Sequence, residues 1–182
     1  MHRILHAAAG LGVALALIHP ACAAVTESDA GGFAIQQTAH IAAPPDKVYA
    51  ALIVPAKWWS SKHTFSGSAA NLSIDAHGGG CFCEKLPNGG SVEHGEVVVA
   101  MPGAMLRLRG PLGPFQGEGV DGALTFTLKA GADGTDVTLD NVIGGHMRGG
   151  FADWPRRADA MLSDQMTRLK AYLETGTPET KP

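Results

Sequence analysis

The sequence lacks the motifs by which many catalytic sites are recognised. It contains no glycine-rich phosphate loop, no nucleophile elbow and no paired catalytic carboxylates. The run Gly78-Gly79-Gly80 precedes a predicted strand rather than a helix, so it does not indicate a phosphate cradle at a helix N-terminus. Nucleotide-dependent and serine-hydrolase chemistry therefore find no support in the sequence.

Basic clusters and cysteines are also scarce. Lys and Arg total 14 against 17 Asp and Glu, the net charge is −3, and no basic run occurs. A nucleic-acid partner is therefore not expected. Of the three cysteines, only Cys81 and Cys83 lie outside the N-terminal segment. Residues two apart on a strand rarely reach disulfide geometry, so a bond between them is not expected, and their redox state stays open.

Long uncharged runs are absent except at the N-terminus. The segment 1–3 carries the charge through Arg3, residues 7–18 are an apolar run without charge, and the small residues Ala21-Cys22-Ala23 follow. This layout is typical of a secretory signal peptide cleaved after Ala23 or Ala24. The apolar run is shorter than the roughly 20 residues that a membrane span needs, and the sequence before Cys22 is a poor lipoprotein signal.

We therefore divide the chain into a signal peptide (1–24), a flexible leader (25–34), one domain (35–175) and a disordered tail (176–182). The predicted localisation is periplasmic or secreted, without stable membrane insertion after the signal is removed.

The clearest regular pattern covers residues 151–173. Apolar residues recur there at spacings of three and four, which predicts an amphipathic helix with one broad apolar face. Pro155 suits the first turn, and Gly176 and Pro178 follow as stop signals. So wide an apolar face needs a surface to cover it.

The residues before this helix are expected to form a sheet that covers its apolar face. A strand is expected at 33–41, and Pro44-Pro45-Asp46 then opens a helix that Pro55 ends. Short alternating runs separated by turns follow, which is typical of an antiparallel sheet with one solvated face. They lie at 81–86, 91–101, 105–110, 120–129 and 135–143. The predicted fold class is α+β, with two short helices after the first strand and a curved antiparallel sheet wrapped around the long C-terminal helix.

Several local motifs accompany this order of elements: residues 41–52, Lys57-Trp58-Trp59, Gly79-Gly80-Cys81-Phe82, His94-Gly95, Gly134-Thr135 and the closing helix. With these motifs the chain resembles the helix-grip fold of the START/Bet v 1-like (SRPBCC) superfamily, in its bacterial branch related to polyketide cyclases and Hsp90-ATPase-activator homology domains. The resemblance implies a cavity between sheet and helix for an apolar or amphipathic molecule, and no shared set of catalytic residues. The export signal departs from the chaperone activators, which are cytosolic.

The register of the predicted hairpin at 81–98 decides which polar groups meet. An even-length loop sets Glu84 opposite Glu93, a like-charge pair that costs stability. It also brings Cys81, Cys83 and His94 together as a soft metal site. An odd loop with a bulge at Gly89 or Gly90 places Glu84 and His94 on one face. We favour the odd loop, and we expect no metal and no cofactor.

In the odd register, Phe82, Glu84, Val92 and His94 share a face. If that face is concave, Glu84 and His94 form a buried polar pair in an apolar cavity. Such a pair can transfer protons or anchor a ligand. The alternatives are a structural pair whose bonds are satisfied within the protein, or a pair that faces solvent.

Further ligand-binding candidates are aromatic or polar residues near the predicted cavity. One of the adjacent Trp58 and Trp59 is expected to face inward and the other to lie at the surface, with packing as the main role. Asn141 interrupts an apolar face and needs partners, either backbone or ligand. The other candidates are His63 after the tryptophans, Phe126 on an alternating strand, and His146 in a glycine-rich turn, which is either a hinge or a tight reversal.

We expect an exported protein that binds a small hydrophobic molecule rather than an enzyme. One alternative is a cyclase- or hydrolase-like enzyme on the same fold that uses Glu84 and His94 for proton transfer. The other is a protein-interaction module similar to the chaperone activators, with a protein partner and a filled interior.

Overall fold

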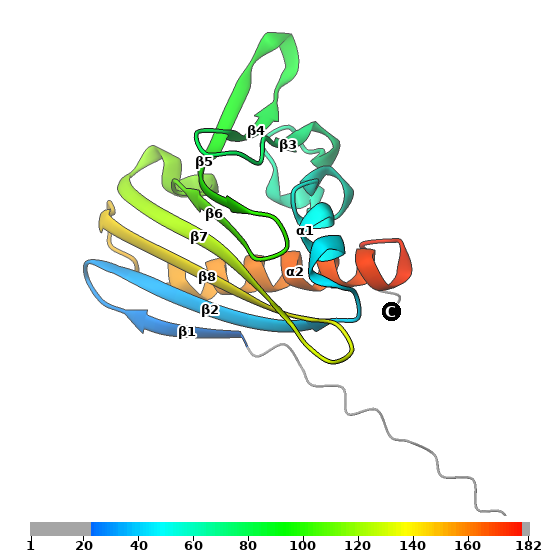
Figure 1. Cartoon of the computed structure of the whole chain (residues 1–182). Helices are drawn as coiled ribbons and strands as arrows, with labels where there is room; N and C mark the ends of the chain where they lie inside the picture. Colours follow the sequence, from blue (N-terminus) through cyan, green and yellow to red (C-terminus); the bar gives the residue numbers. More distant parts are fainter. Residues whose placement is uncertain (1–22, 180–182) are drawn as a thin grey trace, which may run out of the picture.

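The sheet of this protein contains eight strands, all paired antiparallel in the order β1-β2-β8-β7-β6-β5-β4-β3. A computed structural model describes residues 23–179. Figure 1 shows the strands curving past the long helix, with the β4–β5 hairpin projecting beyond the rest. The strands are β1 (Ala23–Ser28), β2 (Gly32–Ile41), β3 (Leu72–Ile74), β4 (Cys81–Lys85), β5 (Ser91–Met101), β6 (Met105–Arg109), β7 (Gly119–Ala130) and β8 (Thr135–His146).

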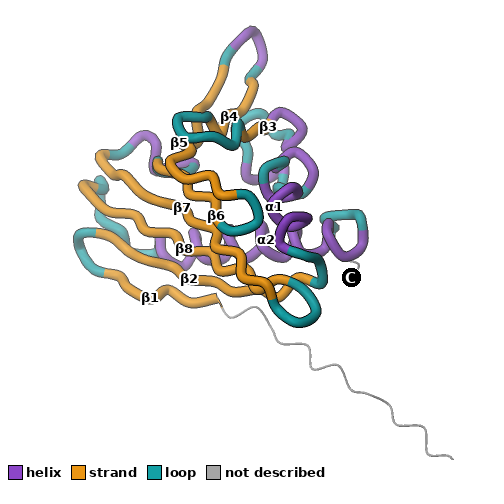
Figure 2. Tube along the Cα trace, in the orientation of Figure 1, coloured by secondary structure: helices purple, strands orange, loops and turns teal. Residues whose placement is uncertain are grey.

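Two α-helices and several short 3₁₀ turns complete the fold. Helix α1 (Pro45–Leu52) has a proline in its first turn, and Asp46 lies near the positive end of its dipole. Figure 2 shows the short helical turns that follow α1 gathered on one side of the strands. These turns are η1 (Pro55–Lys57), η2 (Ser61–His63) and η3 (Ala69–Asn71), and later ones are η4 (Pro87–Gly89) and η5 (Gly113–Gly117).

Helix α2 (Trp154–Thr175) lies across one face of the sheet (Figure 1). Pro155 is in its first turn, and Gly176 ends it in the left-handed conformation at φ 81°. Both signals were read correctly from the sequence, and the α+β helix-grip architecture is confirmed. The buried positions repeat every three or four residues: Pro155, Ala158, Leu162, Gln165, Met166, Leu169 and Ala171.

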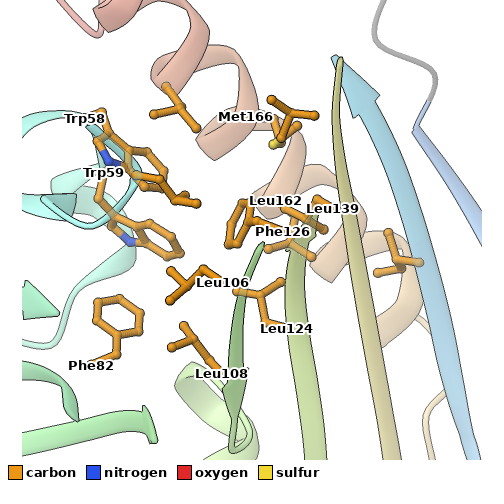
Figure 3. Close-up of a cluster of buried hydrophobic side chains, with 14 of the residues drawn as sticks. Trp58, Trp59, Phe82, Leu106, Leu108, Leu124, Phe126, Leu139, Leu162 and Met166 are labelled. Atoms are coloured by element: carbon orange, nitrogen blue, oxygen red, sulfur yellow. The ribbon is translucent and has the colours of Figure 1, made fainter. Parts of the chain in front are cut away.

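The core lies between the sheet, α2 and the segment after α1. Figure 3 shows the indole rings of Trp58 and Trp59 facing side chains of β6 and β7, with Phe82 of β4 beside them. Leu162 and Met166 reach the same core from α2. Because these residues come from distant parts of the chain, burial of this apolar surface holds the sheet around the helix.

The structure differs from the prediction of a flexible leader at residues 25–34. Residues 23–28 form β1, an edge strand that pairs with β2. The Asp29 carboxylate accepts hydrogen bonds from the backbone N–H groups of Gly31 (2.7 Å) and Gly32 (3.1 Å), which closes the turn between the strands. Residues 1–22, with most of the predicted signal peptide, and residues 180–182 of the predicted tail lie outside the described residues.

None of the helices within residues 23–179 is long and apolar enough to cross a membrane.

Candidate functional site

The β4–β5 hairpin has the odd register that we favoured. Glu84 pairs with Val92 and Cys83 with Glu93, across a five-residue loop at 86–90 that contains Asn88 at φ 57° and Gly89 at φ 78°. The register then shifts again, because Phe82 pairs with Gly95 and leaves His94 as an extra residue of β5. This second bulge was not predicted, and such bulges redirect side chains within a sheet.

Glu84 and His94 form a buried hydrogen-bonded pair. His94 Nε2 lies 2.9 Å from Glu84 Oε2, and the two side chains are 6% and 0% exposed. The Glu84 carboxylate also accepts hydrogen bonds from the backbone N–H groups of Phe65, at 3.0 Å, and Ser66. All three of these groups donate hydrogen bonds to the carboxylate, and such bonds favour its ionised form.

The same contacts set the charge of Glu84. Burial by itself raises the pKa of a carboxyl group, but the hydrogen bonds from Ser66, Phe65 and His94 outweigh it and leave the pKa of Glu84 below its ordinary value. Glu84 is therefore ionised at neutral pH. An ionised carboxylate only accepts hydrogen bonds, so Nε2 of His94 carries a hydrogen, and Nδ1 is the nitrogen left for other partners.

Aromatic rings fix the position of the imidazole. The Phe82 ring centroid lies 4.9 Å from that of His94, and the Phe65 centroid lies 5.9 Å away. Phe82 is buried, whereas Phe65 is 56% exposed. The imidazole is thus held by a carboxylate and by two phenyl rings, with little freedom to turn.

A pocket of about 490 Å³ opens beside His94, between α2 and the sheet. Strands β3, β4, β5 and β8 line one side, α2 lines the other, and the segments around η2 and η5 contribute the rest. Its apolar wall consists of Trp59, Leu72, Phe82, Leu112, Phe115, Ile143, Trp154, Ala158 and Met161, together with Phe65 and Pro114. Pockets of this size and character accommodate small organic ligands.

The pocket brings together some of the predicted ligand-binding residues but not all. His63, Phe82, His94 and Asn141 line it, and Glu84 lies behind His94. Three others lie elsewhere: Trp58 and Phe126 are in the core, and His146 is exposed at the end of β8.

The two tryptophans differ from the prediction that one would be at the surface. Trp58 and Trp59 are only 1% and 6% exposed. Both can point inward because the chain leaves helical geometry at Trp58 (φ −135°), so the hundred-degree step of a helix does not separate them. The indole N–H of Trp58 donates a hydrogen bond to the backbone carbonyl of Ala51, and that of Trp59 donates to the backbone carbonyl of His63. Trp59, not Trp58, faces the pocket.

Asn141 is the polar group on the β8 side of the pocket. It is 5% exposed, between Leu139 and Ile143 on the inward face of the strand. None of the side-chain hydrogen bonds found within residues 23–179 involves this amide, and the side chain lines the pocket. The amide is therefore available to whatever occupies the pocket.

Cys81 and Cys83 form a disulfide, which corrects the expectation from strand geometry. A regular strand separates such Cα atoms by about 6.6 Å, but here they are 5.3 Å apart, so β4 is contracted at the position that faces the bulge of β5. The disulfide lies on the face opposite Phe82 and Glu84. The alternative metal site of Cys81, Cys83 and His94 is therefore wrong, and no cluster of potential metal ligands occurs in the described part of the chain.

Residues 33–174 match the family described as polyketide cyclase / dehydrase and lipid transport. The chain belongs to this family. A comparison with curated proteins gives no match.

Solved structures show the same fold at low sequence identity. Protein CV1439 from Chromobacterium violaceum is 21% identical with a TM-score of 0.55, over 78% of this chain and 96% of its own. CalU16 from Micromonospora echinospora is 17% identical with a TM-score of 0.57, over 90% and 88%. The Aha1 dimer from Colwellia psychrerythraea is 21% identical with a TM-score of 0.57, over 79% and 97%. The family match confirms the predicted superfamily, and these structures agree with the predicted fold.

Proposed function

We propose that this protein binds a small, largely apolar molecule in the pocket between α2 and the sheet. The observation that carries the proposal is the pocket itself, about 490 Å³ of space beside the buried apolar core. A module that acts only through its surface has no need of such a space, so the pocket favours a ligand over the protein-interaction alternative. Membership of a family described by lipid transport supports the same proposal.

The wall supplies affinity and the polar groups supply orientation. Burial of apolar ligand surface against Phe82, Phe115 and Ile143 contributes about 25 cal/mol per Å². His94 and Asn141 face the ligand from β5 and β8, and each can form a hydrogen bond to one polar atom of it. Glu84 keeps Nε2 of His94 engaged, so the ligand meets a ring of defined orientation.

A direct test uses a neutral apolar fluorescent probe, N-phenylnaphthylamine, with dodecanol as competitor. We expect a saturable rise in fluorescence that dodecanol reverses, and native mass spectrometry of freshly purified protein should show whether a natural ligand accompanies it. A probe that neither binds saturably nor is displaced, together with identical intact and denatured masses, would overturn the proposal.

The Glu84–His94 pair favours a second candidate, proton transfer to or from a bound molecule. A carboxylate that holds one imidazole nitrogen leaves the other free to act as a base. The test measures the rate at which the protein converts a bound molecule as a function of pH. This candidate predicts a bell-shaped profile in the wild type that disappears in His94→Ala, while N-phenylnaphthylamine still binds to the variant. A rate that His94→Ala leaves unchanged removes this candidate.

We also propose that the protein is exported. The pattern of residues 1–24 supports this, and so does the disulfide of Cys81 and Cys83, because disulfides persist in oxidising compartments. The test is expression of the full chain in a bacterial host, followed by fractionation and N-terminal sequencing. A mature N-terminus near Ala24 in the periplasmic fraction is expected, and an uncut cytosolic protein would contradict the proposal.

A further inference from the structure

Charge is distributed unevenly around the pocket. The chain has more acidic than basic residues, 17 against 14, yet no Asp or Glu lines the pocket. Two permanent cations, Lys62 and Arg157, line it instead, and two imidazoles, His63 and His94, accompany them. Pocket linings of one sign concentrate ligands of the opposite charge.

Arg157 is held at the pocket without a carboxylate partner. It is exposed in the first turn of α2, and its guanidinium carbon lies 5.6 Å from the ring centroid of Trp154, another lining residue. Its neighbour Arg156, in contrast, pairs with Asp153 at 2.8 Å. Among residues 23–179 no ion pair occupies Arg157, so its donors are free for a ligand.

Lys62 supplies a second cation from another element. It lies in η2, is exposed, and forms no ion pair among the described residues. The nearest acidic contact on this side is between Asp164 of α2 and His63, with 3.9 Å between Oδ2 and Nε2. Phe65, 56% exposed, adds an apolar ring beside these cations. The pocket thus combines an apolar wall with exposed positive charge.

Resting on the proposed function, we propose that the ligand is an anionic amphiphile, an apolar molecule with one carboxylate. Its apolar body occupies the space between α2 and the sheet, and its carboxylate remains near solvent between Arg157 and Lys62. Arg suits this role because the guanidinium fork matches the two oxygens of a carboxylate. The headgroup keeps part of its hydration at the exposed cations, so the desolvation that burial of a charge would cost is small.

The experiment compares two ligands that differ only in the headgroup, dodecanoate and dodecanol, by calorimetry at neutral pH. Three proteins are measured: the wild type, the double variant Lys62→Gln/Arg157→Gln, and the control Lys47→Gln/Arg156→Gln. The control removes the same two charges from exposed positions that do not line the pocket. Any general effect of net charge therefore appears in both variants.

We expect the wild type to bind dodecanoate about five- to tenfold more tightly than dodecanol, as two exposed ion pairs would give. The Lys62→Gln/Arg157→Gln variant should lose this preference, so that it binds dodecanoate and dodecanol with similar affinity, and the control should keep the preference. Equal affinity for both ligands in the wild type, or a preference that survives in the double variant, overturns the inference while the binding function stands. Failure of both ligands and of N-phenylnaphthylamine to bind overturns the binding function itself.

Discussion

Glu84 on β4 and His94 on β5 are joined by a 2.9 Å hydrogen bond that is almost completely closed to solvent. The pair exists because β5 carries one residue more than β4 between the Cys83–Glu93 and Phe82–Gly95 pairings. It links the two strands of the hairpin, and through Phe65 and Ser66 it also ties the hairpin to the segment after η2. Removing the charge of Glu84 should therefore be felt in stability before it is felt in function.

Glu84→Gln should lower the free energy of unfolding by about 2–3 kcal/mol. The amide of Gln places an NH₂ group where the carboxylate accepts hydrogen bonds, so at least one buried donor loses its acceptor. Urea denaturation at neutral pH measures the change. Glu93→Gln, an exposed position one residue before His94, is the matched control and should stay within about 0.5 kcal/mol of wild type.

The cost of Glu84→Gln should shrink in acid. The pKa of Glu84 is below its ordinary value of 4.5 in the folded protein, so its contribution is complete above that value and is lost as the pH falls through the folded pKa. Hydrogen bonds from Arg148 and Arg109 also lower the pKa values of Glu118 and Asp121, but these act equally in both proteins. Urea midpoints measured from neutral pH downward should converge, and a constant gap would show that Glu84 is not the titrating group.

Filling the pocket should abolish binding without unfolding the protein. Ala158 lies on the inward face of α2 and lines the pocket, so the ring of Ala158→Phe can occupy the space intended for a ligand. Affinity for N-phenylnaphthylamine should fall at least about tenfold, the equivalent of 1.4 kcal/mol. Ala160→Phe places the same ring on the exposed face two residues away and should bind as wild type does. Unchanged binding by Ala158→Phe would place the ligand elsewhere.

Reduction of the Cys81–Cys83 disulfide should have a small effect on global stability. The bond closes a loop of only three residues, for which chain entropy gives about 1.5 kcal/mol. Urea denaturation with and without reductant, together with a thiol assay, measures the difference, and Cys81→Ser/Cys83→Ser should match the reduced protein. A loss of the folded state on reduction would contradict this, and would mean that the contraction of β4 depends on the bond.

Local patterns predicted the parts of the fold that depend on local rules. The spacing of apolar residues in α2 follows from helix geometry, so the helix and its inward face were predicted correctly. The like-charge conflict of Glu84 with Glu93 correctly favoured the odd register over the even one. In both cases the deciding interaction lies within a few residues or across one hairpin.

Features that depend on distant contacts or irregular backbone were missed. β1 is short and begins within the predicted signal peptide, and only its pairing with β2 distinguishes it from a leader. Phe115 lies in a segment of glycine and proline without periodicity, so nothing local marked it as a pocket residue. Trp59 rather than Trp58 lines the pocket because the backbone departs from helical geometry at Trp58. Cys81 and Cys83 lie close together where β4 departs from ideal strand geometry.

The position of β1 constrains the order of events under the export proposal. The backbones of Ala23 and Ala24, where processing is predicted, align with Gln37 and Gln36 in the ladder with β2. Proteases act on chain that is accessible and unpaired. Maturation would then have to precede closure of the first hairpin, and a precursor that folded early would shield its own scissile bond.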